Sequence, residues 1–456
     1  MASRRIVLLG AGSYYFHTVL GELGATPELA GSEVVLFDVN KRRMEMTYGL
    51  GKRLLAKAGK GSTIRKARSL GQAVDGADYV ITSIGVHRPT DKQTEVAEWH
   101  HLDVAACARL GVIHTTGDTV GPAGISQGLR IIPIFLDIAA AMTKYCPDAV
   151  LLNHSNPMGA ICRAISKYSS IHAIGYCHNV YGDLRRISRL LGVPREELDC
   201  TAAGINHMGW FLDIRRGDKD LYPRLKRKVR ALRGAAQVTE YLGEGGGFVK
   251  DVVELFDLYP VGGGRHTIEF FPHARINEKR KDLAYGLRWR GERIKQGKLK
   301  LELRNKETAA RISGAKEVTL PQPHQLSPES MGQQIKSMAF GPERLQFVSV
   351  PNRGAVTNLP DWAVVEVKSR IGPGGAVPIH AGTLPAQAAR WTAAQVYASE
   401  LTIEAAAEGS RQKALQALAC DPMVRDFREA EKILDALVRA QGERLKRFRK
   451  RARRVK

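Results

Sequence analysis

The sequence predicts an α/β protein whose first half folds as a doubly wound parallel sheet. Short apolar runs alternate with helical patterns, which indicates β-α-β units with strands buried on both faces. The first run ends in glycines and the second in an acidic residue, as in folds that bind dinucleotides. The runs are RIVLLGAG at 5–12, EVVLFDVN at 33–40, DYVITSIG at 78–85, AVLLNHSNP at 149–157 and HAIGYC at 172–177.

The pattern changes after residue 175, so we expect two domains. Residues 1–175 form the Rossmann-type domain, and residues 176–456 form an α+β domain that carries metal and substrate residues. In the second part, residues 199–215 have a long strand-like pattern with partial alternation. From Pro378 onward Ala-rich helical periodicity dominates, and it leads into a basic C-terminal helix.

The bulk composition excludes some classes of protein. The formal net charge is +23, which favours anionic partners, but the basic runs lack interleaved aromatic residues and any known nucleic-acid motif. We therefore interpret the charge as a solvated basic surface and do not expect nucleic acid as a partner. No window approaches ~20 uninterrupted apolar residues, so we expect no membrane span. The start, MASRRIVLLGAG, fits the first strand of a cytoplasmic protein, and the six scattered cysteines fit reduced thiols.

The first glycines form a candidate nucleotide motif. Gly10, Gly12 and Ser13 follow the first strand and open a helix, where Gly12 lets the backbone approach a pyrophosphate. The third position of the full fingerprint is Tyr15. Asp38 ends the second strand and is placed to bind a ribose hydroxyl, which favours NAD over NADP, although basic residues close behind it weaken that preference. The alternative is a tight turn without a ligand.

A cysteine and several polar residues stand where predicted strands end. Cys177 lies beside His178 at the end of the fifth run, NHSNP ends the fourth, and His207 lies in a later strand-like segment. A thiolate and an imidazole from different strands can share a borderline divalent cation. The alternative is that each is an ordinary packing cysteine or hydrogen-bonded histidine.

Six motifs in order give the chain a family resemblance. GAGS, GDTVGPAG, NHSNP, CHNV, INHMGW and VPNRGAVTNLPDWAVVEV together resemble glycoside hydrolase family 4, over nearly the whole chain to about Pro422. The resemblance implies an NAD-dependent, manganese-requiring glycosidase on a fold related to lactate and malate dehydrogenases. It also implies a small carbohydrate substrate and a homodimer or homotetramer.

The resemblance also implies roles for single residues. Cys177 and His207 would be the protein ligands of the metal, and His178 would line the sugar pocket. Asn153 would contact sugar hydroxyls near the metal, with Asp118 as a further pocket residue. The Cys-His pair resembles that of the α-acting group.

The implied reaction departs from the usual pair of carboxylates. Carbon 3 of the sugar is oxidised, the proton on carbon 2 is removed, the aglycone leaves by elimination, and water adds back. Reduction at carbon 3 then closes the cycle without net redox change.

The chain departs from the family where the base is expected. In LYPVGGGRHTIEFFP, Gly264 stands where α-acting members have an Asp that takes the carbon 2 proton. Three explanations are open. Another residue serves as the base, with Tyr259, His266 or Asp257 as candidates. Alternatively, an inactivating substitution has replaced the Asp with Gly, or the protein binds its ligand without turning it over. Arg265 and His266 can still hold substrate oxygens or an acidic group.

The sequence leaves more than one substrate and more than one function open. The basic chain suits an α-linked uronide such as a galacturonide, and a neutral α-glucoside or α-galactoside is the other expectation. A plain NAD-dependent hydroxy-acid dehydrogenase on the same fold would need no thiolate ligand. A catalytically impaired anion-binding relative would fit Gly264 and the net charge of +23.

Overall fold

The structure, a computed structural model, describes residues 3–85, 98–271, 276–277, 282–322, 325–326 and 329–450. The last residues of the basic tail, 451–456, lie outside this part. The elements of the first half are β1 Arg5–Leu9, α1 Tyr15–Ala25, β2 Glu33–Phe37, α2 Lys41–Ala58, β3 Thr63–Lys66, α3 Leu70–Val74, β4 Tyr79–Thr82, α4 Glu98–Ala108, α5 Gly121–Tyr145, β5 Val150–Asn153, α6 Met158–Tyr168, β6 His172–Gly175 and α7 Asn179–Leu191.

The second half mixes short strands with helices. Its elements are β7 Asp199–Ile205, β8 Met208–Arg216, β9 Lys219–Asp220, α8 Tyr222–Ala231, α9 Gly234–Leu242, α10 Gly246–Phe256, β10 Tyr259–Val261, α11 Gly263–Thr267, β11 Ile276–Asn277, β12 Asp282–Leu283, α13 Arg290–Ser313, α14 Met331–Phe340, β13 Arg344–Pro351, β14 Val364–Gly372, β15 Gly375–Pro378, α15 Ala386–Glu408, α16 Arg411–Cys420 and α17 Phe427–Gln441.

The main sheet confirms the predicted fold class. Its parallel part has the strand order β3-β2-β1-β4-β5-β6 of doubly wound nucleotide-binding folds. The five predicted apolar runs became β1, β2, β4, β5 and β6, while β3, with the polar sequence TIRK, carried no apolar signal. The polar strand forms at the sheet edge, where only one neighbour is needed.

The second half extends this sheet instead of leaving it. β13 joins beside β6 and runs antiparallel to it, and β14 and β15 follow. A separate antiparallel sheet, β10-β8-β7, packs against β14. The chain after residue 175 therefore contributes to both sheets, and the division into domains at that residue stays a prediction.

The core lies on both faces of the parallel strands. In β1, Ile6 and Leu8 point into one apolar cluster and Val7 and Leu9 into another, and all four are at most 1% exposed. This alternation on two buried faces explains why the strand is apolar at every position after Arg5.

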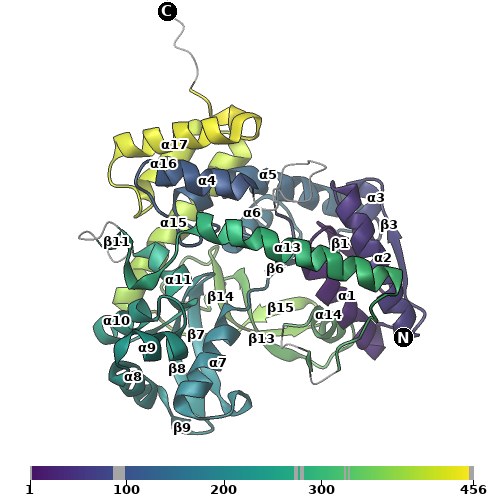
Figure 1. Ribbon diagram of the computed structural model, residues 1–456, viewed down its shortest axis with the longest axis horizontal. Coiled ribbons are helices and arrows are strands. Elements are labelled where there is room, and N and C mark those ends of the chain that lie inside the picture. The colour runs from purple at the N-terminus through teal and green to yellow at the C-terminus, as the bar shows by residue number, and fades with distance from the viewer. Residues whose placement is uncertain are drawn as a thin grey trace, which may run out of the picture.

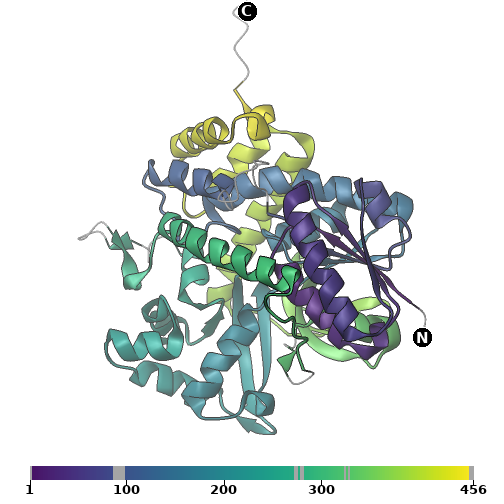
Figure 2. The same ribbon diagram turned by 45° about the vertical axis from the view of Figure 1, so that its right-hand side comes forward.

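Two helical groups cover the sheet and join the halves. α13 runs across the front of the molecule and contacts α4 near one end and α2 near the other (Figures 1 and 2). α15, α16 and α17 pack on α4 and α5 at the opposite side from β9 (Figure 1). By length and composition α5 is apolar enough to cross a membrane, but 61% of its most apolar window is buried inside the fold. Its burial identifies it as a core helix.

The register of the parallel strands aligns their carboxyl ends. Leu9 pairs with Thr82, Thr82 with Asn153, and Asn153 with Gly175. The residues that follow these four ends therefore meet at one edge of the sheet, where ligands bind in open α/β folds.

A buried carboxyl group gives the fold a dependence on pH. Glu22 on α1 is 7% exposed and accepts the Met331 backbone N–H at 2.8 Å, which fixes the start of α14. Burial raises the pKa of Glu22 to about 7, and the hydrogen bonds from Met331 and Ser330 offset this only in part.

We expect the Glu22→Gln variant to flatten the pH dependence of stability. Between its ordinary pKa of 4.5 and about 7, Glu22 is protonated in the folded chain and ionised in the unfolded chain. The free energy of unfolding therefore falls as pH rises, by about 1.4 kcal/mol per unit for this group. Denaturant titrations at pH 5, 6 and 7 measure the slope, with Glu45→Gln on the exposed face of α2 as control. Equal slopes in wild type and Glu22→Gln would contradict the assignment.

Candidate active site

The glycine motif forms a tight turn between β1 and α1. Gly10 has a φ of +80°, and a Cβ there would lie 2.5 Å from the Ser83 carbonyl oxygen, so glycine is required. The Gly12 N–H donates to Asp38 Oδ2 at 2.7 Å, and the hydroxyls of Ser13 and Ser83 are 2.9 Å apart. Asp38 thus braces the turn, a role that the sequence did not indicate.

Cys177 lies just after β6, inside the protein. It is 8% exposed, and hydrogen bonds from the Asn179 backbone and the Asn206 side chain reach its sulfur. Burial, with Glu366 nearby, raises the pKa of the Cys177 thiol well above its ordinary value. The sulfur therefore becomes a thiolate only when a cation compensates the charge.

His207 occupies the turn of the β7–β8 hairpin. Asn206 and His207 link Ile205 to Met208, and His207 has a φ of +70°, a conformation that a histidine rarely adopts. Its Nδ1 is 2.9 Å from Thr119 Oγ1, which leaves Nε2 available for a ligand. Burial lowers the pKa of His207 even though Asp118 opposes the shift, so the ring is neutral.

Three predicted residues from separate elements meet at this hairpin. Asp118, His207 and His266 each offer a ligand atom within 4.8 Å of the others. The rings of His207 and His266 are 4.2 Å apart between centroids, and Asp118 Oδ1 is 3.7 Å from His207 Nδ1. Burial would raise the pKa of Asp118, but His207 and His266 outweigh it and lower the pKa. The sequence predicted each residue but not their grouping.

Asn206 connects this cluster to Cys177. The grouping of three potential ligands does not include the cysteine. The Asn206 side chain contacts the Cys177 sulfur, and its backbone continues into His207. Asn206 therefore contacts one predicted metal ligand, Cys177, and directly precedes the other, His207. It belongs to the INHMGW motif but is not among the predicted site residues.

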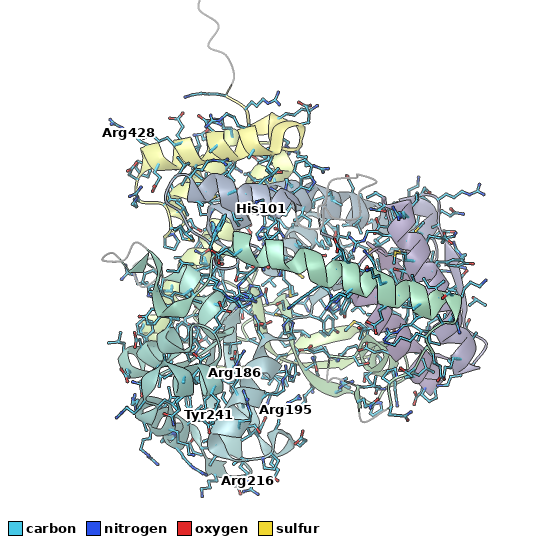
Figure 3. The ribbon with its side chains drawn as sticks, viewed as in Figure 1. His101, Arg186, Arg195, Arg216, Tyr241 and Arg428 are labelled. Carbon is cyan, nitrogen blue, oxygen red and sulfur yellow. The ribbon has the colours of Figure 1, made fainter. Side chains whose placement is uncertain are left out.

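Cationic side chains surround His178. This histidine is exposed at the start of α7, and partial burial of its ring together with Arg185, Arg265 and Arg186 lowers its pKa. Arg186 lies on α7, as Figure 3 shows, and its guanidinium donates to Asp183 at 2.7 Å. A neutral histidine with several arginines near it suits a ligand rich in oxygen or negative charge.

The loop at 243–245 packs directly against Gly264. A Cβ on Gly264 would lie 2.0 Å from the Gly245 carbonyl oxygen and 2.7 Å from its Cα. The chain at 243–245 therefore occupies the space that an Asp side chain at 264 would need. Gly264 is part of a packed contact between the starts of α10 and α11.

Two candidates for a replacement base lie away from the cluster. Tyr259 is 1% exposed and its ring packs edge-on against Phe211, and burial raises the pKa of its hydroxyl far above its ordinary value. Asp257 is on the surface in ion pairs with Lys226 and Arg230. Of the three candidates, His266 lies at the site.

His266 is held by Arg265. The Arg265 Nη2 is 2.8 Å from His266 Nε2, and since a guanidinium only donates, this nitrogen accepts. The proton of the neutral ring is then on Nδ1, which is buried and has no hydrogen-bond partner in the part of the chain described. Burial, His207 and Arg265 lower the pKa of His266 well below its ordinary value.

Asn153 is placed inside the sheet edge. It is fully buried, its Oδ1 accepts from the Thr82 hydroxyl and the Ser155 N–H at 2.9 Å each, and its Nδ2 donates to the Ser155 carbonyl. These contacts fix the end of β5, and the predicted contact with sugar hydroxyls stays a prediction.

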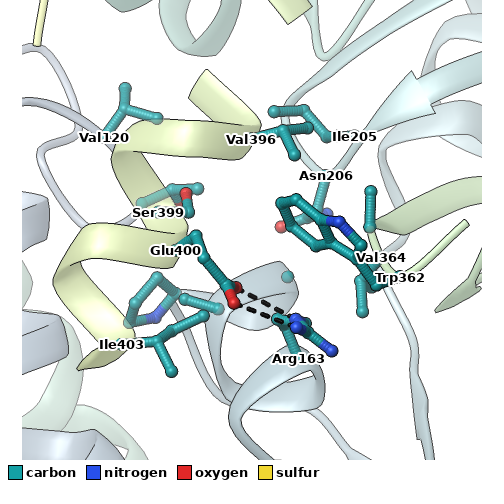
Figure 4. A pocket seen from close by; sticks show the side chains of 15 residues that line it. Val120, Arg163, Ile205, Asn206, Trp362, Val364, Val396, Ser399, Glu400 and Ile403 are labelled. Atoms are coloured by element: carbon teal, nitrogen blue, oxygen red, sulfur yellow. Dashed lines mark hydrogen bonds and ion pairs between the residues drawn. The ribbon is translucent and has the colours of Figure 1, made fainter. Parts of the chain in front are cut away.

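A small cavity is lined in part by Ile205 and Asn206, which belong to the β7–β8 hairpin (Figure 4). It has a volume of about 40 Å³ and is lined by Thr119 and Asn206, by Trp362 and by the Arg163–Glu400 ion pair. Thr119, which contacts His207, and Asn206, which contacts Cys177, are thus both part of its lining.

Two family models match the chain along almost its whole length. The description "Family 4 glycosyl hydrolase" covers residues 5–193, and "Family 4 glycosyl hydrolase C-terminal domain" covers residues 202–424. A doubly wound sheet with a polar cluster at its carboxyl edge and a match to both models defines a glycosidase class. The chain belongs to family 4 of the glycosyl hydrolases.

Relatives and solved structures agree with this. An α-galactosidase of Bacillus subtilis (strain 168) is 30% identical over 92% of this chain and 93% of its own. An α-galacturonidase of Thermoanaerobacterium saccharolyticum is 29% identical over 95% and 94%. A 6-phospho-α-glucosidase from gut microorganisms, in complex with NAD and Mn²⁺, matches with a TM-score of 0.77 at 22% identity over 97% and 99%.

The wider fold relationship is also supported. Malate dehydrogenase from Plasmodium falciparum, in complex with NADH, matches with a TM-score of 0.50 at 14% identity, over 89% of this chain and 99% of its own. At this identity the match speaks for the fold alone. It supports the expected relation to malate dehydrogenases.

We expect side chains at residue 264 to destabilise the protein. Gly264→Ala places a Cβ against the Gly245 backbone and should lower the free energy of unfolding by about 3 kcal/mol. Gly264→Asp should destabilise at least as much and should not raise activity. Gly182→Ala on α7, whose nearest neighbour is 3.9 Å away, is the matched control in thermal unfolding. A stable and more active Gly264→Asp variant would show instead that only a base is missing.

Proposed function

We propose that the protein hydrolyses α-linked glycosides with NAD and a divalent metal, preferably manganese. The supporting observation is that the Gly10–Asp38 turn and Cys177 lie at the carboxyl edge of one sheet, where Asn206 of the β7–β8 hairpin contacts Cys177 and leads into His207. A 6-phospho-α-glucosidase of the same fold is a complex with NAD and Mn²⁺. Bound NAD supplies reversible hydride transfer at carbon 3, and the metal supplies polarisation of the sugar oxygens.

The residues present fit both groups. Gly10 and Gly12 open α1 for a pyrophosphate, while Asp38, already bonded to Gly12, is placed for the adenosine ribose. Cys177 and His207 offer the sulfur and nitrogen donors that a borderline cation accepts. The buried Asn206 Oδ1 and His266 Nδ1 have no partner among the described residues, as expected beside a polar ligand.

The sugar is held by the remaining residues of the cluster. His178 and Arg265 bind its hydroxyl oxygens, Asp118 accepts from a hydroxyl, and Thr119 keeps the His207 ring in place. His266 Nδ1–H donates to a sugar oxygen, because Arg265 holds the other nitrogen as an acceptor. The proton on carbon 2 therefore needs a different acceptor.

Two carboxylates are available near His266 and Gly245. Asp118 is in the cluster itself, and Glu244 precedes Gly245, with its Oε1 buried and without a hydrogen-bond partner among the described atoms while Arg293 binds Oε2. We propose that one of these two carboxylates, Asp118 or Glu244, accepts the proton from carbon 2. Deuterium exchange at carbon 2 in Asp118→Asn and Glu244→Gln, measured at saturating metal and sugar, distinguishes them, since loss of the acceptor stops exchange even when both are bound.

The charges favour an acidic sugar. Arg185, Arg186 and Arg265 gather about His178, and Arg290 acts on Asp118 from α13. A uronide carboxylate or another anionic group on the sugar matches these arginines better than a neutral hexose does. An α-galacturonidase is among the relatives. We propose an α-galacturonide as the preferred substrate.

The test is an assay in heavy water with NAD, manganese and a reductant. Nitrophenyl α-galacturonide, α-galactoside and α-glucoside are the substrates, and mass spectrometry follows the sugar. We expect nitrophenol release with deuterium at carbon 2, fastest for the galacturonide. Release without deuterium, or net NADH formation from a hydroxy acid, would contradict the proposed reaction.

We expect Asp38→Ala to weaken cofactor binding. The variant loses the acceptor of the Gly12 N–H and of the ribose, so the Kd for NADH should rise roughly tenfold, as for loss of one charged hydrogen bond. Fluorescence titration with NADH measures it, and the Glu45→Gln variant on the next helix serves as control. An unchanged Kd would show that Asp38 only shapes the turn.

A further inference from the structure

We propose that Glu366 is a positioning residue for the metal ligand Cys177 and acts through Asn206. The inference rests on the proposed function, because it takes Cys177 as a metal ligand. Glu366 belongs to the VPNRGAVTNLPDWAVVEV segment, which the site described above does not use.

The sheet brings Glu366 to the end of β6. Glu366 on β14 pairs with Ser349 on β13, and Ser349 pairs with Gly175, two residues before Cys177. Glu366 is 3% exposed and Ser349 is fully buried. Two strands of the second half thus carry a buried carboxyl group to the strand that presents the cysteine.

One asparagine amide joins the carboxyl group to the sulfur. Asn206 Nδ2 donates to Glu366 Oε1 at 3.3 Å, and the Asn206 side chain also hydrogen-bonds the Cys177 sulfur. Since Asn206 Oδ1 has no partner among the described residues, both contacts use the two hydrogens of Nδ2. The oxygen of Glu366 therefore determines how this amide faces the sulfur.

Several buried polar atoms between Glu366 and Cys177 have no hydrogen-bond partner among the described residues. Four side-chain atoms along this path are buried without a hydrogen-bond partner in the described chain: Asn206 Oδ1, Glu366 Oε2, Ser349 Oγ and Asn179 Nδ2. Unpaired buried groups cost free energy, and these four belong to residues on the segments that meet near Cys177. They fit a sulfur whose charge and neighbours change when a cation binds.

An N–H donor to a bound thiolate has a defined chemical effect. It stabilises the negative sulfur, fixes its orientation and reduces the cost of releasing the thiol proton. Removing the Glu366 oxygen leaves the Asn206 amide free to rotate, so the thiolate loses a donor although Cys177 itself is untouched. A residue that only packed β14 against β7 would not have this effect on the sulfur.

Metal binding to the cofactor-free protein tests the inference. Mn²⁺ affinity is measured from the electron paramagnetic resonance signal of free Mn²⁺, and Co²⁺ loading is followed by the thiolate-to-cobalt charge-transfer band. We expect Glu366→Ala to weaken Mn²⁺ binding by about tenfold or more and to shift or weaken the band. Glu366→Gln, which keeps the acceptor oxygen, should restore both. Ser369→Ala, buried on the same strand, is the control.

A double-mutant cycle separates a path through Asn206 from a general loss of structure. We expect Glu366→Ala to cost nothing further in an Asn206→Ala background, since the bridge is already broken. Additive losses would overturn the inference, and so would a Glu366→Ala protein with wild-type affinity and band. If the wild-type band is absent, Cys177 is not a ligand and the proposed metal site itself is wrong. That result is distinct from a failure of Glu366 alone.

Discussion

The register of four parallel strands is the constraint on which the site depends. Because Leu9, Thr82, Asn153 and Gly175 are aligned across the sheet, the segments after β1, β4, β5 and β6 open at one edge. A shift of one residue in any pair would turn the side chains of that strand to the other face. The buried Thr82–Asn153 hydrogen bond helps to hold this register. The buried Asn153 of the NHSNP segment thus has a structural role in the sheet.

The second half of the chain completes the site from three directions. The β7–β8 hairpin inserts His207, α11 brings Arg265 and His266, and α13 lies across the front and brings Arg290 toward Asp118 (Figure 1). Glu269 holds this assembly together, because its carboxylate accepts the backbone N–H groups at 115, 116 and 117. Burial lowers the pKa of His207 and His266, so both rings are neutral.

The close contact between Gly245 and Gly264 joins the starts of α10 and α11. The two segments approach so closely that neither position accepts a side chain without displacement. A side chain at 264, such as the Asp that the family resemblance leads us to expect, would have to displace the loop at 243–245.

The doubly wound half, the glycine turn after β1 and the family could be recognised from the amino-acid sequence. Apolar runs, glycines at fixed positions and motifs such as CHNV are local in the chain, so they can be recognised without contacts. The extension of the same sheet by β13–β15, the distance of Tyr259 and Asp257 from the cluster, and the contact of Asn206 with Cys177 and Glu366 became visible only in the folded chain. These facts depend on pairing between residues more than a hundred positions apart, as between Asn206 and Glu366. A local sequence pattern does not indicate which distant strand will pair with a given strand, because that choice depends on how the whole chain packs.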